Sequence, residues 1–292
     1  MRKLFYITVI FLLTLCLCGC NVRNDSAQIV TTTLPVYEFT TMLCKGTGLT
    51  VGQLVTESVS CLHDYSLQVR QMRMIEQADM IVISGAGLED FLDDALTLAP
   101  VIIDASVNAH IHESSEDHGD DDHNHAHEHD PHIWLSPENA KHMAESICSG
   151  LAQQYPVYTK TFENNLSQLI GKLDALEQYG TETLKSLTCR ELITFHDGFS
   201  YLAESFDLTI LYAIEEESGS EASAAELIDL IELIQHNQLS AVFTEKNGSV
   251  SAANIIAAET GVSVCTLDMA ISGDSYFAAM YQNIDTIKEA LT

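Results

Sequence analysis

Residues 157–187 read VYTKTFENNLSQLIGKLDALEQYGTETLKSL, and this stretch decides the architecture. Its apolar positions fall mostly three or four residues apart, which is the spacing of one helical face. Pro156 suits the first turn of such a helix, and Gly171 and Gly180 are tolerated interruptions. One continuous helix would be about 45 Å long, enough to join two lobes. Two shorter helices broken near Gly180 are the alternative. The apolar stripe consists of Phe162, Leu166, Leu169, Leu173, Leu176 and Leu184.

On either side of this stretch, short β-branched or apolar runs alternate with helical patterns. Such alternation is typical of βαβ units and predicts one small parallel sheet in each half. We therefore expect an α/β protein of two lobes, each sheet flanked by helices, joined by one long linker helix. The expected strands are 28–33, 51–55, 80–84, 101–104, 192–195, 208–214, 241–244 and 262–267. The expected helices between them are 36–44, 67–77, 87–97, 198–204, 222–236 and 249–260.

Composition divides the chain into five expected segments. They are a lipoprotein signal peptide (1–19), a tether (20–27), an N-terminal α/β lobe that includes a His-rich loop (28–137, loop 110–130), a helical segment with the linker helix (138–187) and a C-terminal α/β lobe (188–292).

The first twenty residues, MRKLFYITVIFLLTLCLCGC, are typical of an export signal. Arg2 and Lys3 precede an apolar run of about a dozen residues, which is short for a transmembrane helix. Gly19 is the small residue that a lipoprotein box places before its lipidated cysteine, so we expect lipid on Cys20. This predicts an extracytoplasmic protein that is lipid-anchored to the bacterial cell membrane. An ordinary secretory signal or an uncleaved anchor is the alternative.

The charge balance excludes some partners. The 292 residues contain 13 Lys+Arg and 42 Asp+Glu, a formal net charge of −29. So acidic a surface repels nucleic-acid phosphates, and we expect no nucleic-acid partner. The hydrophobic content of 46% is enough for a folded core. We expect a monomer.

Five cysteines would remain beside Cys20 after cleavage, and an odd number leaves at least one unpaired. The sequence permits a pairing of Cys44 with Cys61 and of Cys189 with Cys265 without deciding either. The chain has no CxxC motif, so a thiolate zinc site is not indicated. The five are Cys44, Cys61, Cys148, Cys189 and Cys265.

Residues 110–130, HIHESSEDHGDDDHNHAHEHD, form a low-complexity His-rich loop. Imidazoles and carboxylates are ligand types for zinc, but such a loop offers no single rigid geometry. Either the loop collects zinc with low affinity, or it is a solvated insertion that binds metal only incidentally. If it collects zinc, it is an auxiliary metal loop whose alternating histidines are His123, His125, His127 and His129.

Four other residues stand where a parallel α/β sheet places its ligands. His63 follows the expected strand 51–55, His132 precedes a helix, and His196 and Asp268 each close a strand. Ligands bind beyond the carboxyl ends of parallel strands, so all four are candidates for one site between the lobes. There is no HExxH, the helical motif that presents two histidines and a base in metalloproteases.

These residues lie in motifs that resemble a known family, and the resemblance covers nearly the whole chain after the leader. The motifs are LHDY (62–65), SGAGLE (84–89), DPHIWL (130–135), FHD (195–197), VFTE (242–245) and TLD (266–268). The chain resembles the ZnuA/TroA-like group, the metal-binding solute-binding lipoproteins of bacterial ABC importers for zinc and manganese. The resemblance implies two lobes joined by one helix, with the metal in the cleft between them.

The resemblance also implies the ligands, which would be His63, His132, His196 and Asp268. Glu245 matches a common family glutamate near the site. We interpret it as a partner for a ligand imidazole, because a metal-bound histidine generally has its other nitrogen tied to a carboxylate or carbonyl. A strand-end salt bridge is the alternative for Glu245.

The function implied is extracytoplasmic capture of zinc and its delivery to an ABC transporter permease in the membrane, without catalysis. Three imidazoles and one carboxylate suit tetrahedral Zn²⁺. Mn²⁺ favours more oxygen ligands, so manganese binding by a protein of the same type is the alternative. From other classes, a zinc-dependent enzyme and a cell-adhesion lipoprotein, an adhesin, remain as further alternatives.

Overall fold

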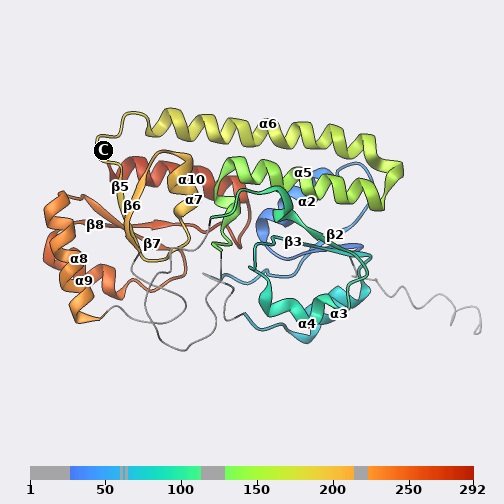
Figure 1. Cartoon of the computed structure of the whole chain (residues 1–292), viewed down its shortest axis with the longest axis horizontal. Coiled ribbons are helices and arrows are strands. Elements are labelled where there is room, and N and C mark those ends of the chain that lie inside the picture. The colour runs from blue at the N-terminus through green and yellow to red at the C-terminus, as the bar shows by residue number, and fades with distance from the viewer. Residues whose placement is uncertain (1–26, 60–61, 63–64, 113–128, 214–222) are drawn as a thin grey trace, which may run out of the picture.

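The computed structural model describes residues 27–59, 62, 65–112, 129–213 and 223–292. Two lobes lie side by side, and one long helix, α6, runs along both of them (Figure 1). Each lobe is built on a sheet of four parallel strands in the described part of the chain. The expected architecture of two helix-flanked parallel sheets with one linker helix is therefore confirmed.

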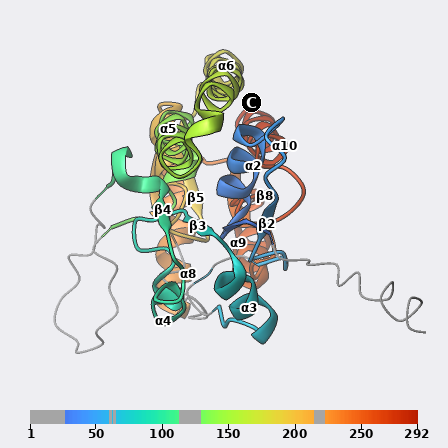
Figure 2. The ribbon, with the colours of Figure 1, turned by 90° about the vertical axis from the view of Figure 1, so that its right-hand side faces the viewer.

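The N-terminal sheet has the strand order β2-β1-β3-β4. Helices α2 and α5 cover one face and α3 and α4 the other (Figures 1 and 2). Because neighbouring residues of a strand point to opposite faces, Ile29 packs in the main core while Val30 packs against the α3 side. The strands are Ile29–Thr31 (β1), Val51–Gln53 (β2), Met80–Ile83 (β3) and Ile102–Asp104 (β4). The helices are Leu34–Leu43 (α2), Val69–Gln77 (α3), Asp93–Leu96 (α4) and Pro137–Gln154 (α5), with 3₁₀ turns at Asp90–Leu92, Ala105–Asn108 and Ile133–Leu135.

The C-terminal sheet repeats this plan with the strand order β6-β5-β7-β8. Leu192 of β5 and Phe243 of β7 face the main core, whereas Ile193 and Val242 pack against α8 and α9. The strands are Glu191–Thr194 (β5), Thr209–Ala213 (β6), Ala241–Glu245 (β7) and Ser263–Leu267 (β8). The helices are Ser200–Ser205 (α7), Ala224–Asn237 (α8), Ser251–Thr260 (α9) and Tyr276–Ala290 (α10).

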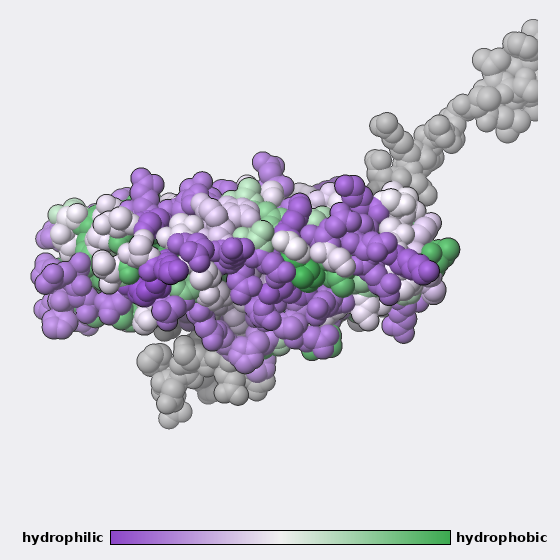
Figure 3. Space-filling model, turned by 90° about the horizontal axis from the view of Figure 1, so that it is seen from above, coloured by the Kyte–Doolittle hydropathy of each residue, from purple (hydrophilic) through white to green (hydrophobic). Residues whose placement is uncertain are grey.

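Helix α6 is one rod that spans Thr159–Leu184, preceded by a 3₁₀ turn at Pro156–Tyr158. It continues through Gly171 and Gly180, so the alternative of two helices broken at Gly180 is wrong. The predicted apolar stripe is buried except for Leu166, which is half-buried, while the outward face is mainly polar (Figure 3). The helix packs against α5 and α2 in one lobe and α10 in the other. A single core cluster extends through both lobes.

The structure differs from the sequence-based prediction over the expected helix at 87–97. The chain forms only a 3₁₀ turn and one turn of α4 there. Glu89 turns inward instead of facing solvent, and its carboxylate accepts the backbone N–H groups of Ser84 (2.7 Å) and Gly85 (2.9 Å). The Thr32 hydroxyl donates to it as well (2.6 Å). These hydrogen bonds hold Ser84 and Gly85 in a loop, and helical structure begins only at Asp90.

The described cysteines are free thiols, so the structure does not pair Cys189 with Cys265. Cys44 is also free, and the partner proposed for it, Cys61, lies outside the described residues. Burial raises the pKa of the Cys44 thiol to about 12, which leaves it unreactive. The leader and Cys20 lie outside the described residues too. None of the helices in the described ranges combines the length and apolar content of a membrane span.

The contact between α6 and the C-terminal lobe gives a first prediction. A Cβ added at Gly180 would lie 2.2 Å from Phe206 Cε1, whereas one added at Gly171 meets nothing within 4 Å. Gly180→Ala should therefore destabilise the protein by about 1–3 kcal/mol through overpacking. Gly171→Ala, the control on the same helix, should stabilise it by roughly 0.5–1 kcal/mol. Urea unfolding measures both. Equal stability of the two variants would contradict this close packing.

Candidate metal centre

The carboxyl ends of β5 and β7 bring His196 and Glu245 together. The strands are neighbours with Thr194 opposite Phe243, so residues two positions further along meet at the same edge. His196 and Glu245 are each only 7% exposed. His196 Nδ1 lies 3.7 Å from Glu245 Oε2, which is an ion-pair distance but too long for a hydrogen bond. The predicted placement of Glu245 beside a candidate ligand therefore agrees with this geometry.

In the N-terminal lobe, Asp130 holds the ring of His132 in place. Its ring is 3% exposed, and Nδ1 lies 2.8 Å from Asp130 Oδ1, which also accepts the backbone N–H of His132 (3.0 Å). The second Asp130 oxygen accepts the hydroxyl of Ser200 from α7. Burial raises the pKa of Asp130, but the hydrogen bonds and charge of His132 and the Ser200 hydrogen bond outweigh it, so the pKa lies below its ordinary value. Asp130 is thus an ionised acceptor for His132.

The two imidazoles face each other across the boundary between the lobes. His132 Nε2 and His196 Nε2 are 3.4 Å apart, and the ring planes are 86° from parallel. Two nitrogens that bind one tetrahedral zinc ion at 2.0–2.1 Å would be about 3.3–3.4 Å apart. Each ring therefore presents Nε2 at a distance suited to a shared ion while its Nδ1 faces a carboxylate, an arrangement typical of metal-ligating histidines.

Close packing fixes both rings. A Cβ at Gly198 would lie 2.7 Å from both His196 Cδ2 and Met269 Cε, so only glycine leaves room for these side chains. Trp134 lies against His132 with ring centroids 5.5 Å apart, and its Nε1 donates to the carbonyl of Met269 (2.7 Å). Met269 thus lies close to Gly198, beside His196, and accepts a hydrogen bond from Trp134, beside His132. It directly follows Asp268 in the sequence.

Asp268 lies just beyond β8, but its carboxylate is engaged elsewhere. Oδ2 accepts Lys246 Nζ at 2.7 Å, and Oδ1 accepts the N–H of Ala270 at 2.9 Å. His63, the remaining predicted ligand, lies outside the described residues. Among the described residues no three His, Cys, Asp or Glu side chains converge to hold a metal. The structure therefore brings together two of the four predicted ligands, and the complete set stays a prediction.

The His-rich loop is described only at its ends. His123, His125 and His127 lie outside the described residues, and His129 is exposed. Tyr201 of α7 joins the two ends, because its hydroxyl accepts the N–H of His112 and donates to the carbonyl of Asp130, both at 2.9 Å. Asp130, which orients the His132 ring, therefore also anchors the loop through its backbone carbonyl.

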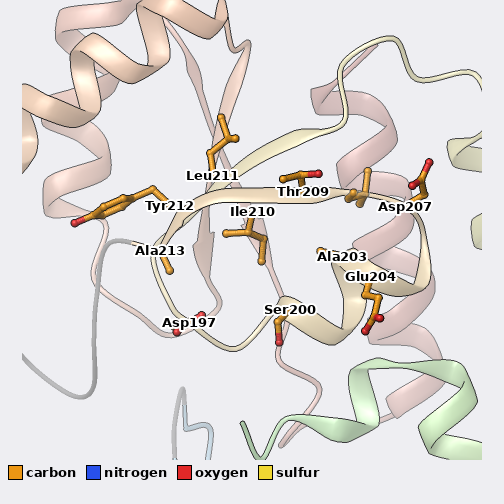
Figure 4. Close-up of a pocket in the computed structure, with 11 residues that line it drawn as sticks. Asp197, Ser200, Ala203, Glu204, Asp207, Thr209, Ile210, Leu211, Tyr212 and Ala213 are labelled. Carbon is orange, nitrogen blue, oxygen red and sulfur yellow. The ribbon is translucent and has the colours of Figure 1, made fainter. Parts of the chain in front are cut away.

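A groove of about 700 Å³ opens between α7 and β6, beside this site (Figure 4). Ser200, which contacts Asp130, and Asp197, which follows His196, lie in its wall. The lining includes three carboxylates but no imidazole, so we locate the candidate metal centre at the histidine pair. The lining residues are Asp197, Ser200, Ala203, Glu204, Asp207, Leu208, Thr209, Ile210, Leu211, Tyr212 and Ala213.

Sequence reasoning missed the roles of Asp130, Ser200 and Lys246. Asp130 carried a local signal, since an Asp two residues before a backbone N–H commonly accepts it in a turn. Ser200 and Lys246 carried none, because their contacts depend on how α7 and the two strand ends pack.

Comparison with known proteins identifies the relatives of this chain. The model of the family described as "Zinc-uptake complex component A periplasmic", ZnuA, matches residues 29–290. The zinc-binding lipoprotein AdcA of Streptococcus pneumoniae is 29% identical over 282 residues, which cover 91% of this chain and 56% of AdcA. The chain thus spans little more than half the length of that relative. The high-affinity zinc uptake system protein ZnuA of Bacillus subtilis is 29% identical over 311 residues, covering 99% of this chain and 97% of that protein.

Solved structures of similar proteins have the same fold as this chain. A crystal structure of ZnuA superposes with a TM-score of 0.79 at 28% identity, covering 91% of this chain and all of that one (100%). The Zn(II)-bound structure of AdcA from Streptococcus pneumoniae gives a TM-score of 0.76 at 29% identity, covering 91% of this chain and 58% of that one. The laminin-binding protein Lmb of Streptococcus agalactiae, at 22% identity and a TM-score of 0.78 over 91% of this chain and 100% of that one, shows likeness of fold alone.

The role of Asp130 gives a second prediction. Asp130→Asn removes the charge that holds the His132 ring, so metal affinity should fall by about 10–100-fold, as is usual when the partner of a ligand histidine is changed. Asp229→Asn, which removes the same charge from an exposed position on α8, is the matched control. Isothermal calorimetry with Zn²⁺ measures both. Equal affinities in the two variants would show that Asp130 does not act on the site.

Proposed function

The chain belongs to the family of the periplasmic zinc-uptake component ZnuA, and from that premise we propose that it captures Zn²⁺ outside the cytoplasm and delivers it to an ABC import permease. The family is one of solute-binding transport proteins, and the relatives named as zinc-binding or zinc-uptake proteins support zinc as the cargo. They favour neither an enzyme nor an adhesin.

The observation that carries the proposal is the buried pair of imidazoles. His132 and His196 come from different lobes and present Nε2 atoms 3.4 Å apart, while a carboxylate faces the Nδ1 of each. Two buried imidazoles whose Nε2 atoms lie at the separation of neighbouring zinc ligands are what a shared ion requires. Imidazole suits Zn²⁺ better than Mn²⁺, which favours oxygen, so manganese is the second candidate cargo.

In the proposed site His63 and Asp268 complete the ligand set around the two imidazoles. Four protein ligands leave no open position for a reactive water, which distinguishes a binding site from a catalytic zinc site. Asp130 and Glu245 keep the imidazoles oriented, and Gly198 and Trp134 fix the rings by contact. Capture then consists of replacing the water around the ion with protein ligands, of which the two imidazoles already face each other.

Delivery requires the protein to stay near its permease. Lipid on Cys20 would hold it to the outer surface of the cell membrane, with residues 21–27 as the tether. The core that is shared between the lobes and the continuous α6 support a small motion on loading rather than a wide closure. The permease would therefore recognise a surface that both lobes form together.

The ligand assignment predicts the outcome of a calorimetric titration. The mature wild-type protein should bind one Zn²⁺ tightly, and Mn²⁺ more weakly. His132→Ala and His196→Ala should each abolish the tight event. His142→Ala should leave it intact, because that partly exposed histidine of α5 pairs with Glu138 and Glu145 on its own helix. Unchanged tight binding in a His63→Ala, His132→Ala, His196→Ala variant would rule out this site.

The His-rich loop is tested by deletion of residues 113–128, which keeps the hydrogen bond between Asp130 N and His112 O (3.2 Å) at its base. If the loop is an auxiliary collector, the deletion should remove weak zinc binding and leave the tight event. Loss of the tight event would instead place a ligand of that site in the loop.

A further inference from the structure

The carboxylate expected to bind the ion, that of Asp268, already has a cation. Lys246 Nζ lies 2.7 Å from Asp268 Oδ2, the side chain of Asp268 is 19% exposed and that of Lys246 is 54% exposed. Oδ1 accepts the N–H of Ala270, so both oxygens are engaged. His132 and His196, in contrast, present their Nε2 atoms to each other.

The fold itself creates this ion pair. Strands β7 and β8 pair up to Glu245 opposite Leu267, and the N–H of Lys246 donates to the carbonyl of Leu267 (2.8 Å). Lys246 and Asp268, the residues that directly follow these two strands, are therefore neighbours by register. This contact follows from the strand ends and needs no special loop.

Asp268 is the fixed partner of the pair and Lys246 the movable one. The buried amide of Asn283 accepts the N–H of Asp268 (2.8 Å) and donates to its carbonyl (2.7 Å), which anchors the backbone at this point. Lys246 reaches Asp268 with a long side chain that is half-exposed. An ion pair with one half-exposed partner contributes little to stability and exchanges readily.

A divalent ion at Asp268 excludes the ammonium group from the same position. Two cations within a few ångströms of one carboxylate repel each other, and the repulsion is strong where the surroundings are partly buried. For Asp268 to become a ligand, Lys246 must withdraw into solvent. Lysine suits this role, since its ammonium is strongly hydrated and its stem is flexible.

We propose that Lys246 is a competing cation built into the metal centre: it neutralises Asp268 in the empty protein and is displaced when the ion binds. The inference rests on the proposed function, and specifically on Asp268 as a ligand. Lys246 lowers the affinity of the site and supplies a cation to return to Asp268 as the metal leaves. It thereby favours release to a partner over retention.

The test is a calorimetric comparison of Zn²⁺ binding to wild-type protein, Lys246→Met and Lys246→Arg. Removing the ammonium group should raise the affinity about tenfold, a size typical of one nearby charge in a partly exposed site. Lys246→Arg keeps the charge and should stay within a few-fold of wild type. Lys185→Met, the same change at a 72% exposed lysine at the end of α6, controls for net charge.

Two further measurements separate this mechanism from a general effect of charge. The difference between wild type and Lys246→Met should shrink in about 1 M salt, where the screening length is near 3 Å. In an Asp268→Asn background, Lys246→Met should change the affinity far less, because the two residues act on each other. Equal or lower affinity of Lys246→Met, or the same gain with Asp268 replaced, would overturn the proposal.

The His132→Ala variant distinguishes this failure from failure of the proposed function. If His132→Ala abolishes tight binding while Lys246→Met leaves it unchanged, the metal centre stands and only the competing cation is wrong. If His132→Ala binds zinc as wild type does, the metal centre itself is misplaced.

Discussion

Two buried imidazoles, His132 and His196, face each other from different lobes, and the surrounding structure is organised to keep them there. A buried imidazole needs a partner for each ring nitrogen, because an unpaired polar group in the interior is costly. Asp130 and Glu245 face the two Nδ1 atoms, at 2.8 Å and 3.7 Å. The two Nε2 atoms lie 3.4 Å apart, a separation that suits one ion bound by both.

Holding two rings at that separation requires that the lobes keep their relative position. The main core runs through both lobes without interruption, and α6 packs against helices of each. Trp134 links the His132 segment to Met269 across the boundary through one hydrogen bond. The continuous helix and shared core make the scaffold stiff, so the side chains with the most freedom near the site are exposed ones such as Lys246. Under the proposed function, binding and release would then be local events in an otherwise fixed frame.

Sequence periodicity predicted most of this frame, since all eight expected strands are present and the stripe from Phe162 to Leu184 faces the core. Helix α10 was missed, although Tyr276, Met280, Ile284 and Ile287 recur at helical spacing and are buried. The helix at 87–97 was overestimated because the inward turn of Glu89 depends on donors from Ser84 and Thr32, which periodicity does not register. The position of His196 was predictable, because the residue lies just beyond the end of β5. The roles of Asp130, Ser200 and Lys246 were not, since they arise from a turn, a helix contact and a strand register.

The most direct test of the shared ion is zinc X-ray absorption spectroscopy on protein lacking residues 113–128, loaded with one equivalent of Zn²⁺. This deletion removes four of the seven loop histidines from the signal, namely His118, His123, His125 and His127. The account predicts only nitrogen and oxygen ligands at about 2.0–2.1 Å, with imidazole outer-shell scattering that decreases in both His132→Ala and His196→Ala. A sulfur ligand near 2.3 Å, or imidazole scattering that is the same in all three proteins, would contradict it.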